Sequence, residues 1–301
     1  MKKIILLLIL TIMAVTAFTG CSQPEATQKP VIITSIVPTK TFIENIVGDT
    51  YEVVAIVPPG ASPASYQPTP DEMLKISQAA YYFSIAVPTE VANILPKISE
   101  FNEEVQLVMV NELVAETYPE RYFEEDHEED HEEEEEGHDH EGRDPHIWLS
   151  PLRVMEMLRV ITDTLVADHP EHREAFEASR DAYLGELESL HEYILEETAA
   201  LPNRAFIMYH PSYGYFAEDY GFEMLAIEDD GKEETAKGIE QIISYARENN
   251  IRVIFYQAEF DSEQAETVAR ELDGVTKMLT PLSPDYVESL KEAIDAFKSV
   301  Y

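Results

Sequence analysis

The sequence predicts an α/β protein with two βα lobes, each containing a parallel sheet, joined by one long rigid backbone helix. Three observations support this fold class. Short apolar, β-branched runs alternate with helical patterns early in the chain, and the same alternation resumes near its end. Between them, residues 171–199 keep helical spacing without a proline. A chain of 301 residues is also long enough for two modest domains.

The first lobe is expected to span residues 31–168. Its helix near residue 71 has a clear start, because Thr69 is a good cap, Pro70 suits the first helical position and Glu72 completes a capping box. The other helical patterns lie around residues 42–47 and 90–98. Strands are expected at 31–37, 53–57, 80–86 and 105–110.

A helical region separates the two lobes. Ser150 and Pro151 begin a helix, and residues 171–199 would form a second one about 43 Å long, which is enough to span both lobes. We assign residues 169–200 to this linking helix and 201–301 to the second lobe. Strands of that lobe are expected at 205–208, 224–227, 253–256 and 275–279, with helices from about 212, 235, 262 and 284.

The first residues are typical of an export signal. Lys2 and Lys3 precede an apolar run that is too short to span a bilayer comfortably, and small residues then precede Cys21. This resembles a lipoprotein signal, so residues 1–21 are expected to be a signal peptide with Cys21 lipidated, and 22–30 a tether. Plain secretion is the alternative. Because Cys21 is the only cysteine, disulfides and thiolate metal ligands are both excluded.

The chain is strongly acidic, with a formal net charge of -38. Such a surface repels phosphate backbones, so no nucleic-acid partner is expected. Residues 124–141 contain 13 acids and no Lys or Arg. By composition, residues 111–143 are expected to form a disordered loop. Its histidines would bind metal ions only weakly, because ordering the loop opposes binding; they are His127, His131, His138 and His140.

Two other histidines lie where a ligand site is expected. His210 directly follows a predicted strand of the second lobe, and ligands tend to bind at the carboxyl ends of parallel strands. His146 precedes the helix that begins at Pro151, and Asp144 is placed to orient its ring. Either histidine alone is as consistent with a hydrogen-bonded structural role. One histidine per lobe favours a shared site.

Four motifs in this order resemble the periplasmic zinc- and manganese-binding proteins of ABC importers: PPGASPASYQPTP at 58–70, DPHIWLSP at 144–151, MYHPSYGYFAEDYG at 208–221 and VIFYQAEFD at 253–261. The histidine-rich loop is similar to that of the zinc branch. The resemblance implies an extracytoplasmic, lipid-anchored or periplasmic solute-binding protein, a monomer without enzymatic activity. It would hold Zn²⁺, or else Mn²⁺ or another divalent ion, in the interlobe cleft and deliver it to a membrane permease and its ATPase.

The chain departs from the family at three ligand positions. Ala64 stands where a histidine is usual, Gln257 where a glutamate is usual, and Thr280 where some relatives have an aspartate. Only His146 and His210 are therefore retained, and zinc needs three or four donors. The additional ligand is expected among Glu228, Asp229, Glu259, Gln67, His138 and His140.

Other functions remain open at this point. The missing ligands also fit a binding protein for a metal chelate or a cobalamin-like ligand on the same helical-backbone plan. An extracellular zinc hydrolase would use both histidines and a carboxylate around a metal-bound water. No HExxH motif supports that hypothesis. A surface metal buffer without a transporter is a third alternative.

Overall fold

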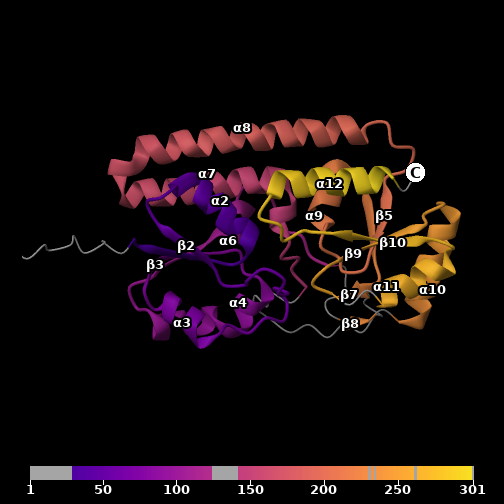
Figure 1. The fold of residues 1–301 in the computed structure, drawn as a ribbon, viewed down its shortest axis with the longest axis horizontal. Helices are drawn as coiled ribbons and strands as arrows, with labels where there is room; N and C mark the ends of the chain where they lie inside the picture. Colours follow the sequence, from indigo (N-terminus) through magenta and orange to yellow (C-terminus); the bar gives the residue numbers. More distant parts are fainter. Residues whose placement is uncertain (1–28, 124–141, 230–231, 234, 261–262, 300–301) are drawn as a thin grey trace, which may run out of the picture.

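The computed structural model describes residues 29–123, 142–229, 232–233, 235–260 and 263–299. Figure 1 shows two α/β lobes side by side beneath one long helix. The predicted fold class is confirmed. The signal peptide with Cys21, most of the tether and the acidic histidines His127, His131, His138 and His140 lie outside the described residues.

Both lobes have a four-stranded parallel sheet with the same topology. The first has the order β2-β1-β3-β4, formed by β1 (Val31–Thr34), β2 (Glu52–Ala55), β3 (Ala79–Ser84) and β4 (Gln106–Met109). The second has the order β10-β9-β5-β6, formed by β5 (Ala205–Met208), β6 (Glu223–Ala226), β9 (Val253–Gln257) and β10 (Val275–Leu279). In sequence order within each lobe, both are 2-1-3-4 arrangements. The structural repeat is therefore much closer than the sequence suggests.

Helices cover both faces of each sheet, because parallel strands are connected through crossovers. The first lobe contains α2 (Val37–Val47), α3 (Pro70–Ile76), α4 (Pro88–Asn93), η2 (Leu95–Lys97), α5 (Ile98–Phe101) and α6 (Val110–Ala115). The second contains α9 (Gly214–Tyr220), α10 (Ala236–Glu248), α11 (Glu263–Glu271), α12 (Tyr286–Lys298) and a small hairpin of β7 (Glu228–Asp229) and β8 (Lys232–Glu233).

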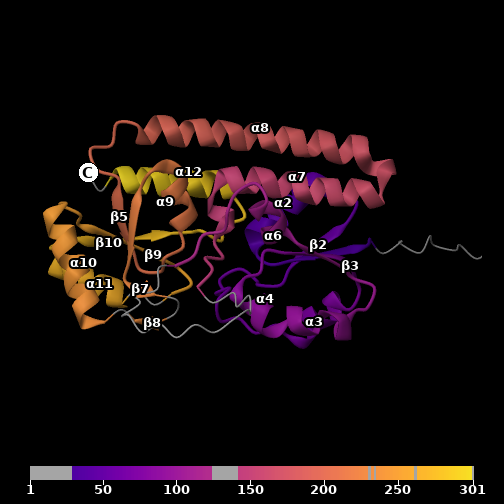
Figure 2. The ribbon, with the colours of Figure 1, turned by 180° about the vertical axis from the view of Figure 1, so that it is seen from behind.

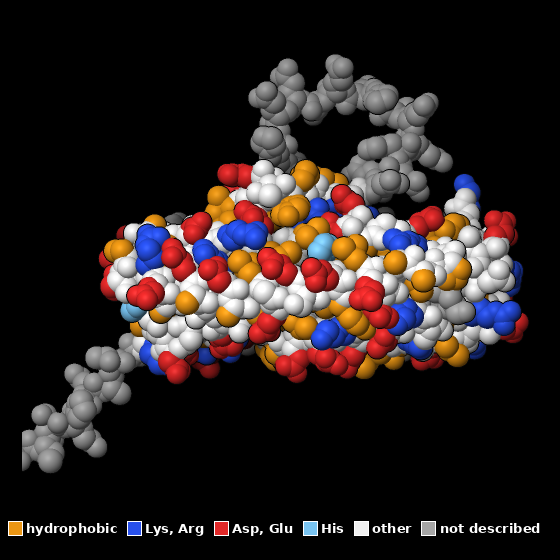
Figure 3. Space-filling view, turned by 90° about the horizontal axis from the view of Figure 1, so that it is seen from above, with side chains coloured by type: hydrophobic (Ala, Val, Ile, Leu, Met, Phe, Trp, Pro, Cys, Tyr) orange, Lys and Arg blue, Asp and Glu red, His pale blue; other side chains and the backbone are white. Residues whose placement is uncertain are grey.

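Two antiparallel helices form the backbone of the molecule. They are α7 (Pro151–Asp168), preceded by the short η3 (Ile147–Leu149), and α8 (Arg173–Thr198), preceded by η4 (Pro170–His172). Helix α8 packs on α7 and α2 of the first lobe and on α12 and α9 of the second. Figure 2 shows the same arrangement from behind. Figure 3 shows the molecule from the side on which α8 lies, where acidic side chains (red) are spread over the surface among Lys and Arg (blue).

One hydrophobic cluster extends through both lobes, and each lobe has a second, separate cluster of its own. The shared cluster joins Phe42 of α2, Leu187 of α8, Phe206 of β5 and Phe297 of α12. The Trp148 indole also donates a hydrogen bond to the Pro281 carbonyl of the other lobe, at 3.0 Å. A shared core of this kind resists movement of one lobe against the other. Among the described residues, no helix combines the length and apolarity needed to cross a membrane.

Several expected boundaries are wrong. The strand expected at 31–37 ends at Thr34, and α2 begins at Val37, because Pro38 suits a helix start. The helix expected at 90–98 is divided near Pro96, which lacks the backbone N–H that a helix interior needs. The disorder expected over 111–143 is wrong for 111–123 and 142–143: α6 buries Val114, and Tyr122 forms a β-bridge with Arg143.

Candidate metal centre

A cavity of about 420 Å³ lies where the two lobes meet. It is lined by residues that follow the carboxyl ends of strands: Ser62, Pro63, Ala64, Ser65, Val87 and Pro88 in the first lobe, and Tyr209, His210, Glu228, Gln257, Glu259, Phe260 and Leu282 in the second. Arg143, Pro145, His146 and Trp148 close it between the lobes. This is the position at which doubly wound α/β folds bind ligands.

His146 is held by Asp144, two residues before it. The Asp144 Oδ1 atom accepts from the His146 backbone N–H at 3.0 Å and pairs with His146 Nδ1 at 2.7 Å. Its other oxygen accepts from Arg121 at 2.9 Å. Asp144 is fully buried, so both oxygens depend on these partners. The ring of His146 is thus fixed with Nδ1 toward the carboxylate.

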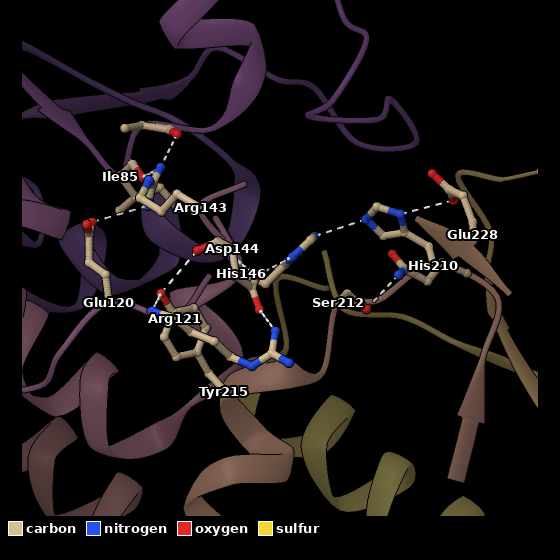
Figure 4. Close-up of polar contacts among 12 residues, drawn as sticks. Ile85, Glu120, Arg121, Arg143, Asp144, His146, His210, Ser212, Tyr215 and Glu228 are labelled. Carbon is tan, nitrogen blue, oxygen red and sulfur yellow. Dashed lines mark hydrogen bonds and ion pairs between the residues drawn. The ribbon is translucent and has the colours of Figure 1, made fainter. Parts of the chain in front are cut away.

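His210 is fixed in the same way from the second lobe. It follows β5, and its Nδ1 lies 3.1 Å from Glu228 Oε2. The Phe260 ring stacks on the imidazole with centroids 4.3 Å apart. Figure 4 shows the two histidines reaching toward each other from opposite lobes, each with its carboxylate behind it.

The free nitrogens of the two rings converge. His146 Nε2 and His210 Nε2 are 3.1 Å apart. A carboxylate can only accept, so each Nδ1 carries the proton and each Nε2 presents a lone pair. Two lone pairs at this separation repel each other unless a cation lies against both. Tetrahedral zinc, with Zn–N bonds near 2.0–2.1 Å, would hold such nitrogens about 3.3 Å apart.

Burial favours the neutral form of His146. It lowers the pKa of His146 below its usual value, although the hydrogen bond and negative charge of Asp144 oppose the effect. Both histidines are almost completely buried, with 7% and 8% of their surfaces exposed. The neutral imidazole, which is the form that binds metal ions, is therefore favoured at His146.

The candidates for a further ligand are distributed unevenly. Glu228 and Glu259 line the cavity, and Glu228 is already committed to His210. Gln67 is exposed and does not line it. His138, His140 and the side chain of Asp229 lie outside the described residues. Within the described part of the chain, no three His, Cys, Asp or Glu side chains are gathered closely enough to hold an ion.

The three positions that differ from the family's pattern do not supply the missing ligand. Ala64 lines the wall of the cavity without a donor atom. The Gln257 amide donates to Ser212 Oγ at 2.6 Å, which ties β9 to the loop after His210. The Thr280 hydroxyl lies 3.4 Å from Ser289 Oγ on α12. The site thus has two imidazoles in place, and Ala64 on the first-lobe wall adds no donor atom.

Residues that sequence reasoning missed support the Asp144–His146 unit. Tyr215 donates to the Asp144 carbonyl at 3.1 Å and accepts from the Arg121 backbone N–H at 2.8 Å. A Cβ at Gly214 would lie 2.5 Å from Arg121 Nη1 and 2.6 Å from Asp144 Oδ2, so a side chain there would displace this ion pair. Arg143 donates to the carbonyls of Ile85 and Ala86 at the end of β3. The only signal was that Gly214 and Tyr215 follow His210 closely in a recognisable motif.

Comparisons with known proteins agree with this geometry. Residues 32–300 match the family model ZnuA, described as "Zinc-uptake complex component A periplasmic". The zinc-binding lipoprotein AdcA of Streptococcus pneumoniae strain R6 is 30% identical over 97% of this chain and 56% of its own length. The chain therefore spans about half of that relative. The high-affinity zinc uptake system protein ZnuA of Bacillus subtilis strain 168 is 26% identical, over 89% of this chain and 86% of its own.

Solved structures show the same fold. A crystal structure of a ZnuA protein has a TM-score of 0.81 at 32% identity, covering 91% of this chain and 99% of its own. The periplasmic zinc-binding protein TroA of Treponema pallidum, at 17% identity, shares the fold with a TM-score of 0.76 over 90% of this chain and 99% of its own. The resemblance read from the motifs is confirmed, and the chain belongs to the ZnuA family of periplasmic zinc-uptake components.

Proposed function

We propose that this protein captures a divalent transition-metal ion, zinc above others, in the interlobe cavity and delivers it to the permease and ATPase of an ABC importer. The observation that carries the proposal is the pair of Nε2 atoms 3.1 Å apart, each on a ring whose Nδ1 faces a carboxylate. Such carboxylate–histidine units are typical of zinc sites. The zinc-binding relatives support the same ion.

Capture and release change only the ligands bound to the metal ion, and no covalent reaction takes place. The imidazoles displace water from the ion as it enters, and Asp144 and Glu228 keep both rings in the binding orientation. The continuous core beneath α8 limits closure of the lobes, so binding relies on preorganised donors. Release then depends on the permease, which competes for the ion or favours a state with weaker donors.

The protein acts outside the cytoplasm as a monomer anchored through Cys21. The apolar run before Cys21 and the lipoprotein among the relatives support this location. Mass spectrometry of the N-terminus of the wild-type chain from the membrane fraction should find a lipid on Cys21, and Cys21→Ala should lack it. An unmodified Cys21 thiol in the membrane-bound wild-type chain would contradict lipid anchoring.

The test of the metal site is a zinc titration of the mature chain against a competing chelator, which suppresses weak binding by the acidic loop. His146→Ala and His210→Ala should each lower the affinity by on the order of 100-fold or more, because loss of supporting groups alone costs about 10–100-fold. His169→Ala is the matched control, since that histidine lies at the α7–α8 junction beside Glu171. Tight binding retained in both cavity variants would reject the site.

A chelated metal is the second candidate ligand. The observation in its favour is the cavity volume of about 420 Å³, because a zinc ion with two waters needs roughly 60 Å³ at about 30 Å³ per water. Native mass spectrometry of the protein as isolated would show an organic mass bound with the metal. A bare ion alone would exclude this candidate. Membership in a family of metal-transport receptors gives the hydrolase hypothesis no support.

A further inference from the structure

The two imidazoles leave the proposed site short of donors, and this inference rests on that proposed function. Zinc is held by three or four N, O or S ligands. The first-lobe wall offers Ala64 in place of a donor, and Gln257 and Thr280 are engaged elsewhere. A further ligand must come from another residue on the cavity wall.

Within the described ranges, Glu259 is the carboxylate on the cavity wall that has a buried oxygen without a hydrogen-bond partner. It lies just beyond the end of β9 and lines the same cavity as His146 and His210. The next residue, Phe260, stacks on the His210 ring, so the backbone at Glu259 is carried to the edge of the histidine pair. By contrast, Glu228 is paired with His210, and Asp144 with His146 and Arg121.

The environment of Glu259 disfavours a free charge. Its Oε2 atom is buried, and no residue in the described ranges gives it a hydrogen bond. Burial raises the pKa of this carboxyl group, although a backbone hydrogen bond within the residue opposes the rise. A buried acceptor without a partner is costly. A divalent cation against the two Nε2 atoms would supply the missing partner.

We propose that Glu259 is the third protein ligand of the metal ion and takes the place of the imidazole that is missing at position 64. In the present arrangement, no three potential ligands among the described residues converge. Ligation therefore requires the Glu259 side chain to rotate toward His146 and His210. The result is a two-histidine, one-carboxylate donor set, a combination that zinc accepts well and that leaves one position for water.

The donor set has a consequence for selectivity. Two neutral imidazoles and one carboxylate leave a net charge of +1 on a bound divalent ion, and the single oxygen donor makes the site poorer for manganese than carboxylate-rich sites are. Zinc should therefore bind more tightly than manganese in the wild-type chain. Replacing the carboxylate should reduce zinc affinity more than a change in overall charge can explain.

The experiment compares Glu259→Gln with Glu271→Gln, an exposed acid at the end of α11 that makes the same charge change. Zinc affinity is measured by chelator competition, and cobalt(II) spectra report the coordination sphere. Glu259→Gln should lose about 100-fold in zinc affinity and change the cobalt bands, while Glu271→Gln matches wild type. Circular dichroism establishes that each variant is folded.

A double variant tests whether a nitrogen donor can replace the lost carboxylate. In Glu259→Gln, adding Ala64→His places a new imidazole on the opposite wall, so zinc affinity should recover by at least tenfold. Wild-type affinity and spectra in Glu259→Gln would overturn the inference while leaving the proposed function intact if His146→Ala still abolishes tight binding. If His146→Ala also binds normally, the proposed site fails together with the inference.

Discussion

Asp144 orients the His146 ring through one carboxylate oxygen and pairs with the Arg121 guanidinium through the other. Asp144→Asn should keep the shape but remove the negative charge and replace one of the two acceptor oxygens with an NH₂ donor, so it cannot accept from both His146 and Arg121. We expect a 10–100-fold loss of zinc affinity and a measurable loss of stability, because Arg121 is left without its counter-charge. Asp49→Asn, whose side chain is exposed, is the control in the same competition assay. Equal affinities would mean that Asp144 has no orienting role.

Ala64 is the position where the cavity differs from the family's pattern by a single side chain. It lines the cavity wall and is exposed, so a histidine can be added there without overpacking the core. Ala64→His should tighten zinc binding by on the order of tenfold or more, because it adds a nitrogen donor. Gln67→His, at an exposed position on the same loop that does not line the cavity, is a control for position. An unchanged affinity in Ala64→His would show that this wall is too far from the imidazoles.

Glu90 gives a pH prediction away from the metal centre. It is fully buried and accepts from Ser35 Oγ at 2.8 Å and from the Val87 N–H at 3.0 Å. Burial raises its pKa, although these hydrogen bonds oppose the rise. The folded state thus holds the proton more tightly than the unfolded state does. The buried Glu90 carboxyl therefore does not destabilise the protein below the pKa of the unfolded state. Its destabilisation grows as the pH rises from that value to the pKa of the folded state, and it is constant at higher pH.

Glu90→Gln removes that destabilisation while its amide oxygen can still accept both hydrogen bonds. The variant should be more stable than wild type at pH 7 and nearly equal to it at about pH 4, close to the usual glutamate pKa. Urea unfolding at both pH values measures the difference. Glu103→Gln, an exposed acid, should change little at either pH. A loss of stability at pH 7 would show that the ionised carboxylate is worth more to the fold than its burial costs.

At the scale of elements, α8 carries the connection between the lobes through one apolar stripe. Leu187 is fully buried on it, whereas Leu195 on the same helix is 47% exposed. Leu187→Ala should cost about 3–5 kcal/mol of unfolding free energy, through lost burial and a cavity. Leu195→Ala should cost less than about 1 kcal/mol. Denaturant titration of both variants compares them, and equal losses would argue against a packed stripe.

The sequence predicts such elements well where periodicity is strong. The 171–199 pattern corresponds to α8 at Arg173–Thr198, because Phe176, Leu187 and Ile194 repeat at helical spacing. The hairpin β7–β8 was not predicted, because its two-residue strands give no periodic signal. The sequence also pointed to His146 and His210, and the structure brings their Nε2 atoms to 3.1 Å of each other, while their role as metal ligands stays a prediction. The burial of Glu259 and the need for Gly214 depend on contacts between distant segments, so no local pattern reveals them.

At the scale of the whole molecule, the two lobes share one core and should unfold together. Aromatic contacts link Phe42 of the first lobe to Tyr286 of the second at 4.9 Å between centroids. The Arg153–Asp219 ion pair, at 2.8 Å, joins α7 to α9. A ligand bound between such lobes stabilises both. Zinc should raise the midpoint of a single transition, in proportion to the logarithm of its free concentration above Kd.

The net charge of -38 concerns the rate of capture more than the affinity. An anionic surface concentrates cations near the cavity and speeds association, and salt screens that field over about 10 Å at 0.1 M.

Trp148 lies 5.1 Å from the His146 ring and is the only tryptophan, so its fluorescence can follow binding in stopped flow. Raising the ionic strength from about 0.01 M to about 0.5 M, with an anion that does not bind zinc, should slow association by on the order of tenfold. Dissociation, which depends on the buried donors, should change little. An association rate independent of salt would mean that the acidic surface serves solubility and not capture.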